Sequence, residues 1–323
     1  MMKEVVWGMI GCGDVTEKKT APSLYKAEGS RLKAVYSRTK EKAEDWVQRH
    51  GHGQVYETVE ELLADQEINA VYIATPPASH YDYAIQILEA GKVPLIEKPM
   101  ASTYEQCQAI IKRGKEKNLP VYVNFYRRGL DKINKIKELL EKDTIGIPLT
   151  IESRHFAKAA SEDYDRNNLP WRLRPEAGGG KALDTQVHVL DYLSYLFGEI
   201  SSVKGFAENR RGLYEVEDTT VATFRFKNGV LGTATWCYVA DYYLDEVTVR
   251  GTKGKMSFSG TGVTDLIVNG QAVEFENPEH VGLAYIQQII NELLGKGKSP
   301  ANTIQAARTI QIFDELLKDN YRK

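Results

Sequence analysis

Two side chains four positions apart, Asp184 and His188, have the types and the spacing that acid–base chemistry needs. They lie in a stretch near Ala182–Phe197 with helical periodicity, and on a helix a spacing of four puts both on one face. A carboxylate there can fix the tautomer of the imidazole or stabilise its charged form, as a general base working near neutral pH requires. Alternatively, Asp184 stabilises the helix N-terminus and His188 is a core histidine. Asp191 is a second candidate partner of His188.

A lysine in the segment Glu97-Lys98-Pro99 is the third candidate for chemistry. It follows the apolar run Val93–Ile96, which we predict to be a buried parallel strand. Ligands of open α/β sheets bind beyond the carboxyl ends of the strands, so Lys98 is expected at a ligand site. Pro99 restricts the backbone of the lysine before it. The ammonium could stabilise a substrate oxygen as an alkoxide; alternatively, Lys98 pairs with Glu97 in a loop.

A glycine turn near the N-terminus predicts a phosphate site. The run Val5–Ile10 reads as a buried strand, and the residues that follow open a helix: Gly11, Cys12, Gly13, Asp14 and Val15. Gly11 permits a tight turn, and Gly13 lets a pyrophosphate approach the main chain, where backbone N–H groups point at it. Thr16 stands where a third glycine is usual, so the dinucleotide fingerprint is incomplete.

The end of the second predicted strand bears on which dinucleotide binds. In such a unit an acidic residue at this place accepts hydrogen bonds from both ribose hydroxyls. Here the run Leu32–Tyr36 ends in Ser37 and Arg38, with no carboxylate at its tip. A hydroxyl and a guanidinium would suit a 2′-phosphate, so we predict NADP(H) in preference to NAD(H). If Arg38 only stacks on the adenine or begins the next helix, NAD(H) is equally acceptable.

The chain divides into two halves of different pattern. Up to about residue 124, short β-rich runs alternate with amphipathic stretches, which predicts βαβ units and a parallel sheet. After a helix near Gly129–Lys142, alternating strands follow at short intervals, and Asn228-Gly229 predicts a hairpin between two of them. We therefore predict a nucleotide-binding domain over residues 1–124 and an α+β domain over residues 125–323.

Composition narrows the function further. The chain has 323 residues, a net charge of −2 and no block of like charges, which argues against nucleic acid or a membrane surface as partner. No apolar run approaches the roughly 20 residues that span a bilayer, and no secretory leader is evident. The three cysteines, Cys12, Cys107 and Cys237, are widely spaced. They suit a reducing cytoplasm and predict neither a disulfide framework nor a metal site.

The ordered set of motifs resembles the Gfo/Idh/MocA oxidoreductases, which include inositol dehydrogenases, glucose–fructose oxidoreductase and related sugar reductases. The resemblance covers nearly the whole chain and rests on Gly11-Cys12-Gly13, Ala74-Thr75-Pro76-Pro77, His80, Glu97-Lys98-Pro99, Gly178–Gly180 and Asp184 with His188. It implies an N-terminal Rossmann domain with a doubly wound parallel sheet. It also implies a C-terminal substrate-binding domain with an open, largely antiparallel sheet and flanking helices. In many members the exposed face of that sheet makes a homodimer or homotetramer contact.

The same resemblance implies roles for individual residues. Lys98, Asp184 and His188 would be the catalytic set, and Trp171-Arg172 resembles the segment on the substrate side. The predicted cofactor-binding residues are Gly11, Cys12, Gly13, Asp14, Val15, Ser37, Arg38, Thr75, Pro76, Pro77, His80, Glu97, Lys98 and Asn124. Gln186 stands where the family often has glycine, which would place a long polar side chain near the pocket.

The function predicted from these residues is reversible hydride transfer between nicotinamide and a secondary alcohol or carbonyl of a sugar or polyol. His188 would remove the hydroxyl proton, Lys98 would stabilise the alkoxide, and Asp184 would position His188 and bind substrate hydroxyls. One alternative is an enzyme for a dihydrodiol or a tetrapyrrole, for which Trp236-Cys237-Tyr238 and Tyr242-Tyr243 could line an apolar pocket. Another is a non-catalytic dinucleotide sensor, which has no need for the three catalytic residues together.

Overall fold

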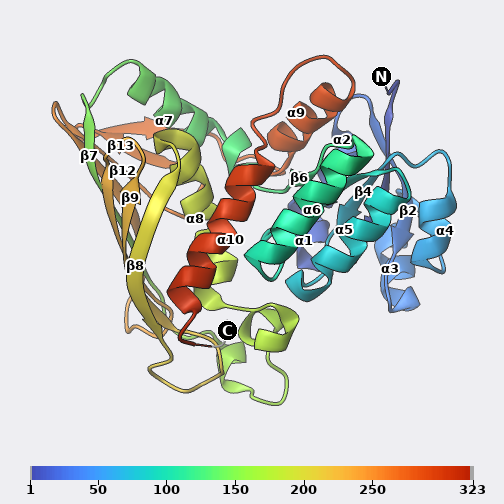
Figure 1. Cartoon of the computed structure of the whole chain (residues 1–323), viewed down its shortest axis with the longest axis horizontal. Helices are drawn as coiled ribbons and strands as arrows, with labels where there is room; N and C mark the ends of the chain where they lie inside the picture. Colours follow the sequence, from blue (N-terminus) through green and yellow to red (C-terminus); the bar gives the residue numbers. More distant parts are fainter. Residues whose placement is uncertain (1, 321–323) are drawn as a thin grey trace. The chain divides into compact units, whose positions relative to one another are not determined.

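The computed structural model describes residues 2–320, which form two compact units (Figure 1). The first comprises residues 2–130 and 278–307, and the second comprises residues 131–277 and 308–320. The chain therefore returns to the first unit before it ends in the second.

A six-stranded parallel sheet forms the centre of the first unit, in the order β3-β2-β1-β4-β5-β6. This is the order of a doubly wound dinucleotide-binding sheet, in which the strand order reverses beside β1. The predicted Rossmann architecture is confirmed. The strands are β1 (Val5–Ile10), β2 (Ser30–Tyr36), β3 (Gln54–Val55), β4 (Ala70–Ile73), β5 (Val93–Ile96) and β6 (Tyr122–Val123).

Seven helices belong wholly to the part of the first unit that the structure describes: α1 (Asp14–Lys18), α2 (Ala21–Lys26), α3 (Lys40–His50), α4 (Val59–Ala64), α5 (His80–Glu89), α6 (Tyr104–Lys117) and α9 (Leu283–Leu293). Helices α2, α3 and α9 share one hydrophobic core with Trp7 of β1. Helix α9 comes from the far end of the chain, yet it packs so closely that a Cβ on Gly129 would lie 2.7 Å from the backbone nitrogen of Tyr285.

The second unit holds an eight-stranded sheet in the order β14-β13-β12-β11-β7-β10-β9-β8. Its neighbours are antiparallel except for β7 and β10, which confirms the predicted largely antiparallel sheet. The Asn228-Gly229 hairpin between β9 and β10 is confirmed, with Gly229 at φ +93°. The strands are β7 (Pro148–Phe156), β8 (Ile200–Glu208), β9 (Thr219–Phe226), β10 (Leu231–Cys237), β11 (Leu244–Gly251), β12 (Lys255–Phe258), β13 (Asp265–Val268) and β14 (Gln271–Glu274).

One face of this second sheet is covered by helices and the other is open. The helices are α7 (Asp131–Glu141), α8 (Lys181–Phe197) and α10 (Thr303–Leu317), the last of which belongs to this unit from residue 308 on. Phe197 of α8 packs edge-on against Phe226, and Phe313 of α10 lies against Trp236. On the open face, Phe206 is 81% exposed. Among the described residues, no helix is both long and apolar enough to cross a bilayer.

Candidate active site

The two glycines of the turn after β1 serve different purposes. Gly11 has φ +103°, and a Cβ there would lie 2.7 Å from the carbonyl oxygen of Ala74, so the fold itself requires glycine. Gly13 has an ordinary φ of −94°, and the nearest heavy atom to a Cβ there would be 4.0 Å away. The absence of a side chain at Gly13 therefore leaves open space beside the first residues of α1, where a phosphate can approach.

Thr16 explains why a third glycine is unnecessary. Its side chain is fully buried, and its hydroxyl donates to the carbonyl of Gly13 at 2.6 Å. The amide of Thr16 donates to the same oxygen at 2.8 Å, so side chain and backbone together close the turn. Beside it, burial raises the pKa of the Cys12 thiol to about 12, with the nearby carboxylate of Glu17 adding to the effect, which keeps Cys12 a small neutral side chain.

Ser37 and Arg38 follow β2 at its carboxyl end, as the sequence predicts. Ser37 is half-buried and accepts a hydrogen bond from the Thr39 amide at 3.3 Å. Arg38 is exposed, and no carboxylate occupies the tip of the strand. The described geometry leaves the guanidinium accessible to a ligand phosphate.

The buried side chain of His80 holds the segment that follows β4. Thr75 and Pro76 follow the strand, and Pro77 begins a short 3₁₀ turn that leads into α5. The imidazole of His80 is fully buried, with Nδ1 2.8 Å from the Pro99 carbonyl oxygen and Nε2 2.8 Å from that of Thr75. Burial lowers the pKa of His80, although the two carbonyls oppose the shift. The ring thus joins the ends of β4 and β5.

Glu97 and Asn124 lie at the ends of the adjacent strands β5 and β6. Both are buried, and the Asn124 amide donates to the Glu97 carboxylate. The hydroxyl of Tyr72, within β4, donates to the same carboxylate oxygen at 2.6 Å. Burial raises the pKa of Glu97, while the bonds from Tyr72 and Asn124 and the charge of Lys98 partly oppose it.

In the second unit, the structure brings Arg172 to Asp184. The guanidinium Nε of Arg172 lies 3.4 Å from the carboxylate of Asp184, and a second nitrogen lies 3.2 Å from Glu162. Gly179 makes this possible, because a Cβ there would lie 2.6 Å from the Trp171 carbonyl oxygen. The close approach that the Gly178–Gly180 run permits is thus to the chain's own Trp171–Leu173 turn.

The first turn of α8 is anchored on other sides as well. The buried carboxylate of Glu217 accepts from the Ala182 amide at 2.7 Å, which satisfies one of the free N–H groups of the helix start. Lys181 pairs with the buried Asp163 at 3.0 Å. His188, 6% exposed, and the fully buried Asp191 follow on the same helix. Asp184 retains a side-chain exposure of 16%.

Gln186 is buried among protein groups. Its amide lies 3.5 Å from the hydroxyl of Thr185, and that hydroxyl bonds to the phenol of Tyr238 at the end of β10. Burial raises the pKa of Tyr238, so the phenol stays neutral. Because only 1% of Gln186 is exposed, its side chain packs α8 onto the sheet.

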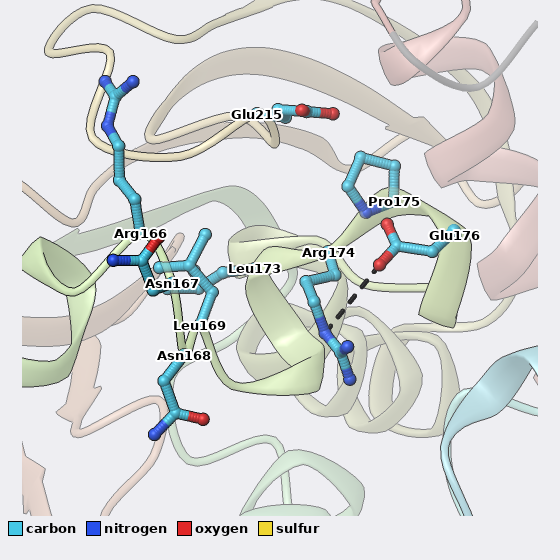
Figure 2. Close-up of a pocket in the computed structure, with 9 residues that line it drawn as sticks. All are labelled: Arg166, Asn167, Asn168, Leu169, Leu173, Arg174, Pro175, Glu176 and Glu215. Carbon is cyan, nitrogen blue, oxygen red and sulfur yellow. Dashed lines mark ion pairs between the residues drawn. The ribbon is translucent and has the colours of Figure 1, made fainter.

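The second unit also has a surface hollow of about 330 Å³. Nine residues line it: Arg166, Asn167, Asn168, Leu169, Leu173, Arg174, Pro175, Glu176 and Glu215. Figure 2 shows the polar ends of Arg166, Asn168 and Arg174 spread outward and not toward one point. No predicted catalytic residue lines the hollow. Within residues 2–320, no group of three or more His, Cys, Asp or Glu side chains could hold a metal ion.

The sequence alone did not identify two sets of supporting residues, those that bond to Glu97 and those that hold the start of α8. Tyr72 and Thr20 both bond to Glu97. A tyrosine within an otherwise aliphatic buried strand is a usable signal, because its hydroxyl needs a partner. Glu217, in a loop, and Asp163, in the short 3₁₀ helix Ser161–Tyr164, hold the start of α8 and carry no such signal.

Comparison with known protein families agrees with this geometry. Residues 5–125 match the oxidoreductase family with an NAD-binding Rossmann fold, and residues 133–257 match the GFO/IDH/MocA C-terminal domain. The chain belongs to the Gfo/Idh/MocA family of oxidoreductases. The resemblance inferred from the motifs is confirmed, and so is a nicotinamide dinucleotide as cofactor.

The alignments with named relatives cover almost the entire chain. Oxidoreductase P35 of Formosa agariphila is 35% identical, over 97% of this chain and 98% of its own. Trans-1,2-dihydrobenzene-1,2-diol dehydrogenase of Sus scrofa is 25% identical, over 97% and 96%. Among solved structures, levoglucosan dehydrogenase in complex with NADH and levoglucosan superposes with a TM-score of 0.85 at 23% identity, over 98% and 96%.

The glycine turn yields a test that separates folding from cofactor binding. Gly11→Ala should lower the free energy of unfolding by about 2 kcal/mol, because it adds a Cβ at positive φ against a carbonyl. Gly13→Ala should leave that free energy within about 0.5 kcal/mol but raise the dissociation constant for the dinucleotide about tenfold or more, since its Cβ enters the phosphate space. Urea unfolding and quenching of protein fluorescence measure the two quantities. Unchanged binding by Gly13→Ala would contradict this assignment of the phosphate site.

Proposed function

We propose that the protein catalyses reversible hydride transfer between a nicotinamide dinucleotide and a secondary alcohol or carbonyl of a sugar or polyol. The observation that carries the proposal is the pairing of Asp184 with Arg172 on the first turn of α8, with His188 one turn further along the same face. The Asp184 carboxylate lies beside the Arg172 guanidinium and keeps 16% of its side chain exposed to a ligand. Hydroxyl-rich substrates are well recognised by such charged donors and acceptors.

The catalytic work would be shared by three side chains. His188 would take the proton from the substrate hydroxyl in the oxidative direction and return it in the reductive direction. Lys98 would stabilise the negative charge on that oxygen, while Asp184 orients His188 and binds neighbouring hydroxyls. The bound nicotinamide supplies the hydride acceptor or donor. Trp171 and Arg172 would complete the substrate side.

The cofactor contacts that we propose centre on the ends of β1, β2, β4 and β5. The turn Gly11–Val15 would hold the pyrophosphate, and Thr75, Pro76, Pro77 and Lys98 would face the nicotinamide ribose. His80, Glu97 and Asn124 belong to the same proposed set. The ring of His80 lies 2.8 Å from the carbonyl oxygens of Thr75 and Pro99, and the Asn124 amide donates to Glu97. These buried contacts hold in place the segments that would face the cofactor.

A dihydrodiol is the second candidate substrate, because a relative is named trans-1,2-dihydrobenzene-1,2-diol dehydrogenase. The aromatic residues of the second unit lend it little support. Trp236 is fully buried and packs on Phe224 and Phe313 in the sheet core, and Tyr243 is 69% exposed. We therefore favour a carbohydrate substrate over a dihydrodiol.

Removal of either proposed catalytic side chain should abolish turnover. Lys98→Met and His188→Ala should each lower kcat by about a hundredfold or more, the usual scale of a lost acid–base or charge-stabilising group. Absorbance of the reduced nicotinamide, followed with a panel of inositols, aldoses, ketoses and dicarbonyl sugars, measures the rate. The matched controls Lys112→Met and His52→Ala change exposed residues of the same types.

Normal turnover in Lys98→Met or His188→Ala would refute the assignment of roles. Tight dinucleotide binding without turnover of any substrate by the parent protein would instead favour a dinucleotide sensor.

Arg38 should decide the preference for the phosphorylated cofactor that we propose. Arg38→Ala should raise KM for NADP(H) about tenfold or more and leave KM for NAD(H) within about twofold, because only the 2′-phosphate needs a bidentate guanidinium. Initial rates with both cofactors provide the comparison. An equal effect on the two would show that Arg38 serves the adenine and not a phosphate.

We also propose that the open face of the second sheet forms the contact of a homodimer or homotetramer. Phe206, Val221 and Leu231 lie on this face with exposures of 81%, 49% and 51%, a concentration of apolar side chains unusual for a free surface. Phe206→Glu should shift the protein toward the monomer in light scattering, with Tyr164→Glu, an exposed aromatic outside the sheet, as control. A monomeric parent protein would exclude the contact.

A further inference from the structure

Four polar side chains of the first unit bond to one another in its interior: Thr20, Tyr72, Glu97 and Asn124. Three of them are completely buried, and Glu97 is 6% exposed. The Glu97 oxygen Oε1 accepts from the Tyr72 hydroxyl at 2.6 Å, from the Asn124 amide, and from the Thr20 hydroxyl at 3.4 Å. Asn124 also donates to the Thr20 hydroxyl at 2.8 Å. We call this set the Glu97 cluster.

Sheet topology brings the cluster together. Tyr72 lies within β4, Glu97 follows β5, and Asn124 follows β6, three neighbouring strands. The Glu97 amide donates to the Ile73 carbonyl at 3.0 Å, and the Asn124 amide donates to that of Ile96 at 2.7 Å. The ladder thus continues one residue past the strands, which sets both side chains at the carboxyl edge of the sheet.

The cluster fixes the backbone at Lys98. The second oxygen of Glu97, Oε2, accepts from the Lys98 amide at 3.2 Å. On the other side of the lysine, the Pro99 carbonyl oxygen lies 2.8 Å from His80 Nδ1. The main chain is therefore held both before and after Lys98, and the direction of its side chain depends on these two contacts.

The cluster also reaches the segment after the glycine turn. Thr20 lies between α1 and α2, and its amide donates to the Val15 carbonyl at 3.1 Å. Thr16 closes the preceding turn onto Gly13. Residues 13–20 therefore form a continuous hydrogen-bonded path from the phosphate turn to the carboxylate of Glu97.

We propose that Thr20 and Tyr72 are positioning residues that act through the Glu97 carboxylate to set Lys98 and to couple its placement to the seating of the dinucleotide. This inference rests on the proposed role of Lys98. It assigns a role to Thr20 and Tyr72, neither of which contacts cofactor or substrate in the proposed site.

The charge state of Glu97 links the proposal to a measurable pH dependence of activity. The groups that face it from the packed elements, Tyr72, Asn124, Thr20 and the Lys98 amide, all donate, so the cluster is complete only when Glu97 is ionised. Burial raises the pKa of Glu97, and the Tyr72 bond and the charge of Lys98 lower it. Loss of the Tyr72 hydroxyl therefore raises that pKa further, and activity is lost at a higher pH as the solution is acidified.

Tyr72→Phe is the first test. It should lower kcat about tenfold, the scale of a lost hydrogen bond to a charged group, and move the acidic limb of the kcat–pH profile to higher pH. Tyr56→Phe is the matched control, because Tyr56 also donates to a carboxylate of this unit at 2.6 Å, that of Asp65. In a Glu97→Gln background, which cannot titrate, Tyr72→Phe should produce no shift of the limb. A purely structural tyrosine would lower stability in urea and leave the limb in place.

Thr20→Val tests the coupling to the phosphate turn. It removes the hydroxyl but keeps the shape, and it should raise the dinucleotide dissociation constant and lower kcat together, each about fivefold or more. Thr20→Ser, which keeps the hydroxyl, should restore both to within about twofold. Dissociation constants come from fluorescence quenching, which needs no turnover.

The two proposals fail separately. If Lys98→Met retains turnover, the proposed role of Lys98 is wrong and the cluster has no catalytic lysine to position. If Lys98→Met is inactive while Tyr72→Phe and Thr20→Val match their controls in kcat, limb position and dinucleotide affinity, the positioning role alone is overturned.

Discussion

The buried carboxylate of Glu97 constrains the first unit, because its desolvation is tolerable only while Tyr72, Asn124 and the Lys98 amide all donate to it. Those donors come from three neighbouring strand ends, so the carboxylate cannot be satisfied unless β4, β5 and β6 are in register. A buried carboxylate that would lose its hydrogen-bond donors if the strands shifted register helps to specify one arrangement of the sheet. The residues that follow the strands are then fixed as a group.

The second unit fixes helix α8, which carries two of the proposed catalytic residues, by other means. Helix α8 begins where Gly179 packs against the Trp171–Leu173 turn, and the carboxylates of Glu217 and Asp163 hold its first turn. Tyr238 fastens the same turn to the sheet through Thr185. Because four contacts hold the first turn of α8, the backbone position of Asp184 relative to Arg172 is fixed. Rigid support of this kind is what oriented acid–base chemistry requires.

Family membership and local geometry contribute different kinds of knowledge. The family establishes an oxidoreductase with a dinucleotide-binding Rossmann unit, and the open space at Gly13 fits a phosphate. The substrate is a separate matter, because relatives with the same architecture carry names of a diol dehydrogenase and a levoglucosan dehydrogenase. A shared fold places the reacting groups, whereas the side chains around them select the substrate.

Local patterns in the sequence determined the strands and helices that carry the site, the glycine turn, the hairpin at Asn228-Gly229 and the family. Each of these depends on neighbours within a few residues, through periodicity, turn geometry or spacing. Only the tertiary structure decided that Thr16 closes the turn onto Gly13, that Gln186 packs onto the sheet, that α9 returns to the first core, and that Thr20 and Tyr72 bond to Glu97. These contacts join residues far apart in the chain, or depend on which way a side chain turns. Side-chain hydrogen bonding and packing against distant elements fix them. A local pattern can show that a buried hydroxyl such as that of Tyr72 needs a partner, but it does not show which residue the partner is.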